Sequence, residues 1–282
     1  MNVELKISSA GFCMAGGNHA QRGAKRGNIQ FNAVFALIKH PSKGYILFDT
    51  GYTKRFFEAT NKFPYKIYAA ITKVTLKEGE EVVDQLKAIG IAAADIKYII
   101  ISHFHADHIG GLRDFPNAQF ICTKTGYKDV KGKSGFSGLI KAFIPHLMPK
   151  NFENRTKFID METATITHPD LGKMIDVFDD GTIMMCALDG HALGMIGILV
   201  KTSQREVFLV SDAAWLKSNY QDLKLPHPIV KIFFNSWNDF KDSINRIHKF
   251  YKNNPDTLII PSHCMETYKA LPQDIKWEYE IF

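Results

Sequence analysis

Several features that would assign this chain to a special class are missing from it. No apolar run approaches the roughly 18 residues needed to cross a bilayer, so we expect no membrane span. The first 15 residues carry Glu4 and Lys6 and do not form the basic-then-apolar pattern of a signal peptide, which favours a cytoplasmic protein. The absence of any Cys-X-X-Cys pair argues against a disulfide framework and a thiolate zinc site, since only four cysteines occur, far apart, at Cys13, Cys122, Cys186 and Cys264.

The charge of the chain is modest, and no concentrated basic stripe with interleaved aromatic residues was found. A formal net charge of +6 is compatible with a solvated basic surface or with a mild attraction for anionic substrates, and we expect no nucleic-acid partner. The apolar content of 45% and the charged content of 23% are those of a globular protein with a sizeable core. Because there is no repeat, linker or low-complexity tract, we expect residues 1–282 to form a single domain.

Strands and helices alternate along much of the sequence. Residues 80–89 and 239–252 each carry apolar side chains at helical spacing, and the first of these helices leads into the apolar strand 98–101. Residues 11–30 contain five glycines and are predicted to form a mobile loop, either a solvated tip or a flap beside a site. A helix followed by a buried strand is typical of an α/β layered domain.

Residues 124–180 form a long helical insertion. Within it, apolar side chains recur every three or four residues over 136–148, which predicts an amphipathic helix bent near Pro145. This helix could pack on its own domain, line a hydrophobic substrate pocket as a lid, or form the contact of a homodimer.

The strongest signal is a cluster of metal-ligand residue types directly after strand 98–101. His103, His105, Asp107 and His108 occupy four of six positions, and Gly110 and Gly111 then allow a tight bend. Residues two apart at a strand end point to the same side, so we expect the first three side chains to converge. Imidazoles and a carboxylate grouped in this way are ligands for a borderline metal such as zinc.

The pattern His-X-His-X-Asp-His over residues 103–108 resembles the metallo-β-lactamase-fold hydrolases. This resemblance implies a four-layer αββα sandwich and three further ligands, each at a strand end. The candidates that follow apolar runs in the right order are His191, Asp212 and His263. In the same family an aspartate after an earlier strand holds a ligand histidine from behind, a role that falls here to Asp49.

The resemblance further implies two divalent metal ions, with Zn²⁺ the expected element. One ion would be held by His103, His105 and His191, the other by Asp107, His108 and His263, and Asp212 would bridge them. Two such ions share a water molecule whose pKa falls to about 7, and the resulting hydroxide attacks an ester or lactone carbonyl. Asp107 would transfer the proton.

Within the superfamily, the ligand set, chain length and insertion look most like the quorum-quenching N-acyl-homoserine lactonases, so we expect a small-molecule substrate with an apolar portion. Two departures stand out. Around the fifth ligand this chain has Asp-Gly-His-Ala-Leu-Gly, which keeps only the glycines and His191 of the usual stretch. Three residues after the bridging aspartate, where a tyrosine often donates to the substrate carbonyl, stands Trp215, and Tyr220 is the substitute donor to consider.

Other activities use the same ligands. A glyoxalase II-like thioesterase has all seven, but no basic C-terminal patch for glutathione is recognisable here. A phosphodiesterase would use the same metals and the positive charge, whereas a β-lactamase generally lacks the bridging aspartate. A low-turnover regulatory binding protein on the same fold is the alternative of another class.

Overall fold

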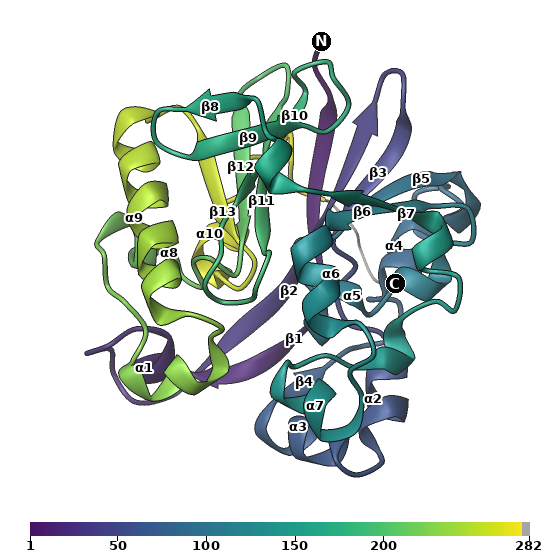
Figure 1. Ribbon diagram of the computed structural model, residues 1–282, viewed down its shortest axis with the longest axis vertical. Helices are drawn as coiled ribbons and strands as arrows, with labels where there is room; N and C mark the ends of the chain where they lie inside the picture. The colour runs from purple at the N-terminus through teal and green to yellow at the C-terminus, as the bar shows by residue number, and fades with distance from the viewer. Residues whose placement is uncertain (278–282) are drawn as a thin grey trace.

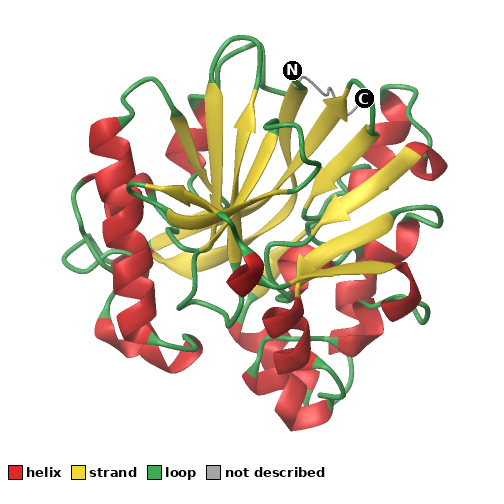
Figure 2. Cartoon of the chain, turned by 45° about the horizontal axis from the view of Figure 1, so that its top comes forward, coloured by secondary structure: helices red, strands yellow, loops and turns green. Residues whose placement is uncertain are grey.

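The computed structural model describes residues 1–277 and shows two β-sheets packed face to face between two layers of helices (Figures 1 and 2). The first sheet has the strand order β4-β1-β2-β3-β5-β6-β7. Its strands are β1 (Glu4–Gly16), β2 (Asn28–His40), β3 (Gly44–Phe48), β4 (Lys73–Thr75), β5 (Ile96–Ile100), β6 (Gln119–Thr123) and β7 (Thr156–Ile159).

The second sheet has the order β13-β12-β11-β10-β9-β8. Its strands are β8 (Ile166–His168), β9 (Gly172–Asp176), β10 (Ile183–Ala187), β11 (Ile196–Lys201), β12 (Glu206–Ser211) and β13 (Leu258–Pro261). The helices on the side of the first sheet include α2 (Lys54–Thr60), α3 (Tyr65–Ile71), α4 (Val82–Ala88), α6 (Lys124–Val130) and α7 (Gly135–Ile140). Those near the second sheet or at its ends are α1 (Gly17–Ala20), α8 (Lys217–Gln221), α9 (Trp237–Asn253) and α10 (Met265–Lys269).

Three clusters of buried side chains hold the layers together. The central one is rich in isoleucine, including Ile38, Ile46 and Ile198, and fills the space between the sheets. One outer cluster packs helices on the first sheet, and the other packs α9 on the second through Phe240 and Ile247. The expected four-layer αββα sandwich is thus confirmed.

Parallel strands bring the functional segments together. β3, β5, β6 and β7 are mutually parallel, as are β12 and β13 in the other sheet. Because the carboxyl ends of parallel neighbours lie at one edge, the turns after β3 and β5 are adjacent, and so are those after β12 and β13. A hydrogen bond of 2.8 Å from the Ser211 hydroxyl to the Ser102 hydroxyl joins these two edges across the sandwich.

The predicted helices over 80–89 and 239–252 are confirmed as α4 and α9, but two other local predictions were wrong. Residues 11–16 do not form a loop, because β1 continues to Gly16 and pairs with β2. The helix predicted over 136–148 stops at Ile140, since Ala142 adopts a left-handed φ of 47° before Pro145 begins a separate 3₁₀ turn.

The insertion over 124–180 is helical only in its first part. It carries α6 and α7, after which β7 joins the first sheet and β8 and β9 join the second. In residues 1–277, no helix combines the length and apolar character that a membrane crossing requires.

Candidate metal centre

The turn after β5 supplies four of the predicted ligands. β5 ends at Ile100, and His105 then occupies the N-cap of the short helix α5 (Ala106–Ile109). Asp107 and His108 lie in the first turn of that helix and are buried. Their convergence therefore depends on the helical turn, and the strand-like alternation predicted for Asp107 was wrong.

The structure brings all seven predicted ligands into two groups. The first contains His103, His105, His191 and Asp212, and the second contains Asp107, His108, Asp212 and His263. Within each group, one nitrogen or carboxylate oxygen from every residue lies within 4.8 Å of the others. Asp212 belongs to both groups, which is the arrangement expected of a residue that bridges two ions.

The spacing of the donor atoms suits metal ions. Asp212 Oδ2 lies 3.1 Å from His191 Nε2 and 3.0 Å from His263 Nε2, while Asp212 Oδ1 lies 3.4 Å from His108 Nε2. Asp107 Oδ2 is 3.5 Å from His108 Nε2 and 3.6 Å from His263 Nε2. Donors at about 2.1 Å from a tetrahedral Zn²⁺ lie about 3.4 Å from one another, so these separations leave room for an ion in each group.

Three of the donor atoms are buried and have no hydrogen-bond partner within residues 1–277. They are His103 Nε2, His108 Nε2 and Asp212 Oδ1. Buried polar atoms without partners cost about 1–3 kcal/mol each, so such a concentration requires an explanation. Two divalent cations supply it, because these atoms point into the two groups.

In two of the predicted ligands, His108 and His263, the ring nitrogen that faces away from the cluster has a hydrogen-bond partner. Asp49 Oδ2 lies 2.7 Å from His108 Nδ1, and the Ser102 N–H and hydroxyl donate to the Asp49 carboxylate at 2.8 and 2.7 Å. The Asn32 carbonyl oxygen lies 2.7 Å from His263 Nδ1. These contacts direct both Nε2 atoms toward the cluster, as second partners of metal-binding histidines do. The role predicted for Asp49 is consistent with this position.

The electrostatic environment favours the metal-binding form of three of the seven residues. Burial, helped by the neighbouring imidazoles, moves the pKa of His103 and His105 well below its ordinary value, so both rings are neutral. Burial raises the pKa of Asp212, but His263, His108 and His191 outweigh it and hold this pKa well below normal. His103 and His105 thus present neutral imidazoles, and Asp212 presents an ionised carboxylate.

His108 and His263 differ from the other ligands. Burial lowers the pKa of His108, but Asp107, Asp49 and Asp212 more than offset it and raise this pKa well above its usual value. The pKa of His263 is raised in the same way, chiefly by Asp212. A metal ion must therefore displace a proton from these rings, and acid weakens its binding.

The two predicted substrate donors lie in different places. The Trp215 indole lies 5.8 Å from the His191 ring, and its Nε1 is buried without a partner among the described residues. The Tyr220 hydroxyl is 3.5 Å from the Ile259 carbonyl oxygen, inside the core beneath α9, and Tyr220 lines neither of the cavities described next. The structure brings Trp215 to the cluster and leaves Tyr220 away from it.

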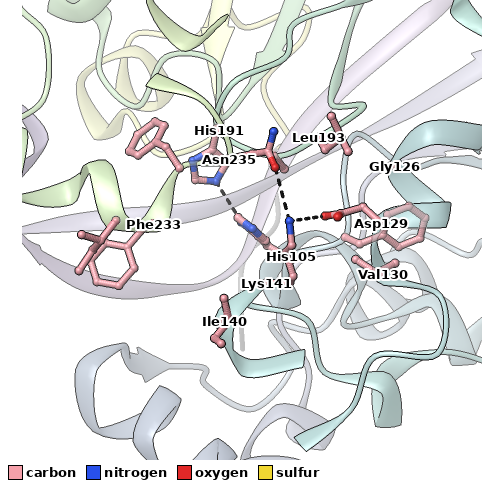
Figure 3. Close-up of a pocket in the computed structure, with 14 residues that line it drawn as sticks. His105, Gly126, Asp129, Val130, Ile140, Lys141, His191, Leu193, Phe233 and Asn235 are labelled. Atoms are coloured by element: carbon pink, nitrogen blue, oxygen red, sulfur yellow. Dashed lines mark hydrogen bonds and ion pairs between the residues drawn. The ribbon is translucent and has the colours of Figure 1, made fainter. Parts of the chain in front are cut away.

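Two cavities flank the His105–His191 pair. The larger, of 330 Å³, is mostly apolar and is walled by residues that include Phe31, Tyr68, Leu139 and Trp215. The smaller, of 180 Å³, lies between Ile140 and Leu193 and contains Lys141 (Figure 3).

Lys141 is a polar residue of the site that was not predicted from the sequence. Its ammonium group lies 2.8 Å from Asp129 Oδ2 and donates to Asn235 Oδ1 at 3.4 Å. Figure 3 shows this group beside the His105–His191 pair. No spacing rule links Asp129, Lys141 and Asn235, since they come from different segments that meet only in the folded chain.

Comparison with known proteins identifies the family. Residues 30–170 match the model of the metallo-beta-lactamase superfamily. The chain is 28% identical to the N-acyl homoserine lactonase AttM of Rhizobium radiobacter over 249 residues, covering 85% of both chains. It is 30% identical to the enzyme of the same name from Azorhizobium caulinodans over 199 residues, covering 68% of each.

Among solved structures, the fold is similar to that of a variant of AiiA from B. thuringiensis with N-decanoyl-L-homoserine bound at the active site. The TM-score is 0.74 at 22% identity, covering 96% of this chain and 98% of that one. With a matching family model, relatives over most of its length and two groups of buried ligands, this chain belongs to the metallo-beta-lactamase superfamily and is a metal-dependent hydrolase.

Proposed function

We propose that this protein is a dinuclear lactonase that hydrolyses the ester bond of a lactone carrying an apolar chain, such as an N-acyl homoserine lactone. The observation that carries this proposal is the apolar cavity of 330 Å³, which reaches from the molecular surface to His105 and His191. The lactonase relatives act on substrates of this kind, as their names state. The ester would lie at the ligand cluster and the acyl chain in the cavity.

Different residues of the chain have different roles in the proposed reaction. Bound in the two groups, divalent ions such as Zn²⁺ supply Lewis acidity that lowers the pKa of water and polarises the ester carbonyl. Asp212 aligns the two groups because it belongs to both. Asp107 belongs to the second group, with its carboxylate 3.5 Å from His108 Nε2, so we assign it the transfer of the proton to the departing alkoxide oxygen.

Trp215 is assigned the orientation of the substrate carbonyl. Its Nε1–H is a donor without a partner in residues 1–277, and the ring is fixed between Phe31 and Phe234, with centroid distances of 5.7 and 5.2 Å. Phe31 also stacks on the His263 ring, with a centroid distance of 4.9 Å. The position of the Trp215 ring is therefore fixed relative to that of His263. A donor held in place before the substrate arrives contributes more to catalysis than a mobile one.

The test is hydrolysis of a substrate panel by metal-loaded protein. It compares acyl-homoserine lactones of increasing chain length with lactoylglutathione and a phosphodiester. We expect the lactones to be preferred and kcat/KM to rise about fourfold per added methylene until the cavity is full, since each buried methylene contributes about 0.8 kcal/mol. Preference for the thioester or the phosphodiester would assign those activities instead, and no turnover at all would favour a regulatory binding protein.

Metal content tests the dinuclear part independently. Wild-type protein should bind about two ions per chain, and His108→Ala or Asp212→Ala should lose at least one of them, as measured by elemental analysis after gel filtration. Tyr220→Phe is the control, because its hydroxyl lies in the core. A wild-type content of one ion would contradict the bridging role of Asp212.

A further inference from the structure

One end of the molecule combines exposed apolar side chains with the mouth of the large cavity. Four segments form it: α1 with the loop that follows, α3, α7 and the 3₁₀ helix η6 (Pro228–Phe233). Figure 1 shows α1, α3 and α7 gathered at this end. All four segments contribute side chains to the cavity wall, so they surround a single opening.

Hydrogen bonds and ring contacts join the segments in pairs. Backbone bonds of 2.9 Å run from Arg22 N–H to the Leu225 carbonyl and from His227 N–H to the His19 carbonyl, and thereby connect the α1 loop to the η6 segment. On the other side, the Phe63 and Phe136 rings meet edge to face at 5.2 Å and connect α3 to α7. We refer to this surface as the mouth face.

The mouth face exposes more large apolar side chains than a solvated surface requires. Ile140 and Ile232 are each 79% exposed and Phe63 is 70% exposed. The same surface carries four more exposed residues, which are Ile71, Phe136, Ile229 and Phe233. Exposed apolar residues that cluster around one opening mark an interaction surface.

The charged side chains on the four segments of the mouth face are all positive. α1 with its loop to Gly27, α3, α7 and η6 contain no aspartate and no glutamate, although Asp129 lies near Ile140 in an ion pair with Lys141. Seven exposed cations lie on these segments or within three residues of them and form no ion pair within residues 1–277, namely Arg22, Lys25, Arg26, Lys62, Lys66, Lys73 and Lys231. The mouth face therefore carries unpaired positive charge beside its exposed apolar side chains.

We propose that the mouth face docks on the surface of an anionic lipid bilayer. Isoleucine and phenylalanine side chains would enter the boundary between headgroups and acyl chains, and the surrounding lysines and arginines would contact the lipid phosphates. A second copy of this chain fits less well, because a twofold contact through this face would set the same cations against each other. A nucleic acid fits less well too, since four of the seven exposed apolar side chains are aliphatic isoleucines, on which bases do not stack.

Docking in this orientation has a consequence for the substrate, which rests on the proposed function. The cavity would open directly into the headgroup region, where lactones with long acyl chains accumulate. Such a substrate could pass from the bilayer to the His105–His191 pair with its chain covered by Ile71, Leu139 and Ile140 throughout.

The experiment measures binding of metal-loaded protein to extruded vesicles by co-sedimentation. Vesicles of phosphatidylcholine mixed with phosphatidylglycerol are compared with pure phosphatidylcholine, each at low and high salt. We expect binding only to the mixed vesicles, weakened by salt. The double variants Phe136→Ser/Ile229→Ser and Lys62→Glu/Lys66→Glu should each reduce the binding constant at least about tenfold, since apolar and charged contacts both contribute.

A matched control comes from the opposite parts of the molecule. Ile89 and Ile166 are 45% and 42% exposed and lie beyond α4 and on β8, away from the mouth face. Ile89→Ser/Ile166→Ser should bind vesicles like the wild type. None of the substituted residues lines a cavity, so hydrolysis of a short-chain lactone in solution should persist in every variant and shows that it is folded.

Three results would overturn the proposal: no binding to mixed vesicles, equal binding to both vesicle types at low salt, or equal losses in the control. Sedimentation of a dimer that the Phe136→Ser/Ile229→Ser variant abolishes would assign the face to a second copy instead. Vesicle binding is measured without turnover. A failure of the lactonase assay would therefore leave this result standing, and the reverse also holds.

Discussion

At the scale of single residues, Asp49 shows how a side chain outside the ligand set can control the ligands. It is fully buried, and its basic partner among residues 1–277 is His108. Asp49→Asn keeps the shape of the side chain but removes the negative charge that orients the His108 ring. The affinity of the second group for its ion should therefore fall about 10- to 100-fold. Competition with a chromogenic chelator measures this change.

The control for that substitution is another histidine–aspartate pair, in which His40 is buried and Asp180 is half-buried. His40 Nε2 lies 2.9 Å from Asp180 Oδ2, at a distance in sequence and space from the ligands. Asp180→Asn should leave metal affinity unchanged. Equal effects of the two substitutions would mean that general destabilisation, and not support of His108, explains the loss.

A second prediction for a single residue concerns Trp215. Trp215→Phe retains an aromatic ring between Phe31 and Phe234 and removes only the Nε1–H donor. We expect kcat/KM for a lactone to fall about 10- to 100-fold with metal content unchanged, because a positioned donor to a developing oxyanion is lost. Unchanged kinetics, as we expect for Tyr220→Phe, would remove Trp215 from the mechanism.

At the scale of elements, the loop between β10 and β11 is held by Gly190, which has a φ of 126°. A Cβ atom there would lie 2.0 Å from the backbone nitrogen of Phe240 at the start of α9. Gly190→Ala should therefore push α9 away and displace His191, lowering stability by about 3 kcal/mol or more in thermal unfolding.

Gly90 provides the comparison, because it also has a positive φ, 79°, but no atom within 4 Å of the added Cβ. Gly90→Ala should cost only about 1 kcal/mol, from backbone strain alone. If both substitutions cost the same, the close approach of α9 to the loop is not what makes Gly190 necessary.

The elements also show what could be predicted from the sequence. α4 and α9 have one apolar face and clear ends, so periodicity located both. The end of α7 could not be predicted, because Phe136 and Ile140 share the apolar spacing of Phe143 and Ile144, although the chain turns at Ala142 and leaves only the first two exposed. The spacing of apolar residues does not distinguish a buried face from an exposed interaction surface.

The candidate site could also be predicted only in part from the sequence. His191, Asp212 and His263 could be selected because each follows an apolar strand, and the structure brings them to the 103–108 cluster. The Asn32 carbonyl behind His263 could not, since a backbone contact leaves no mark in the sequence. The same is true of Lys141, whose partners are joined only by the fold.

At the scale of the whole molecule, metal removal should loosen the contact between the two halves. His103, His105, Asp107 and His108 come from the first sheet, whereas Asp212 and His263 come from the second. Chelation should lower Tm by on the order of 10 °C, and added Zn²⁺ should restore it, if free metal exceeds Kd about 1,000-fold. Calorimetry with and without chelator measures this shift. An unchanged Tm would show that the ions do not tie the sheets together.

The division of the ligands between two sheets also bears on the order of events during folding. Because Asp212 and His103 come from different sheets, we expect the ions to be captured only after the sheets have packed, beyond the rate-limiting barrier of folding. Interactions absent at that barrier slow unfolding and leave the folding rate nearly unchanged. Stopped-flow experiments should thus find that chelator accelerates unfolding alone, so that the bound ions determine how long a folded molecule survives.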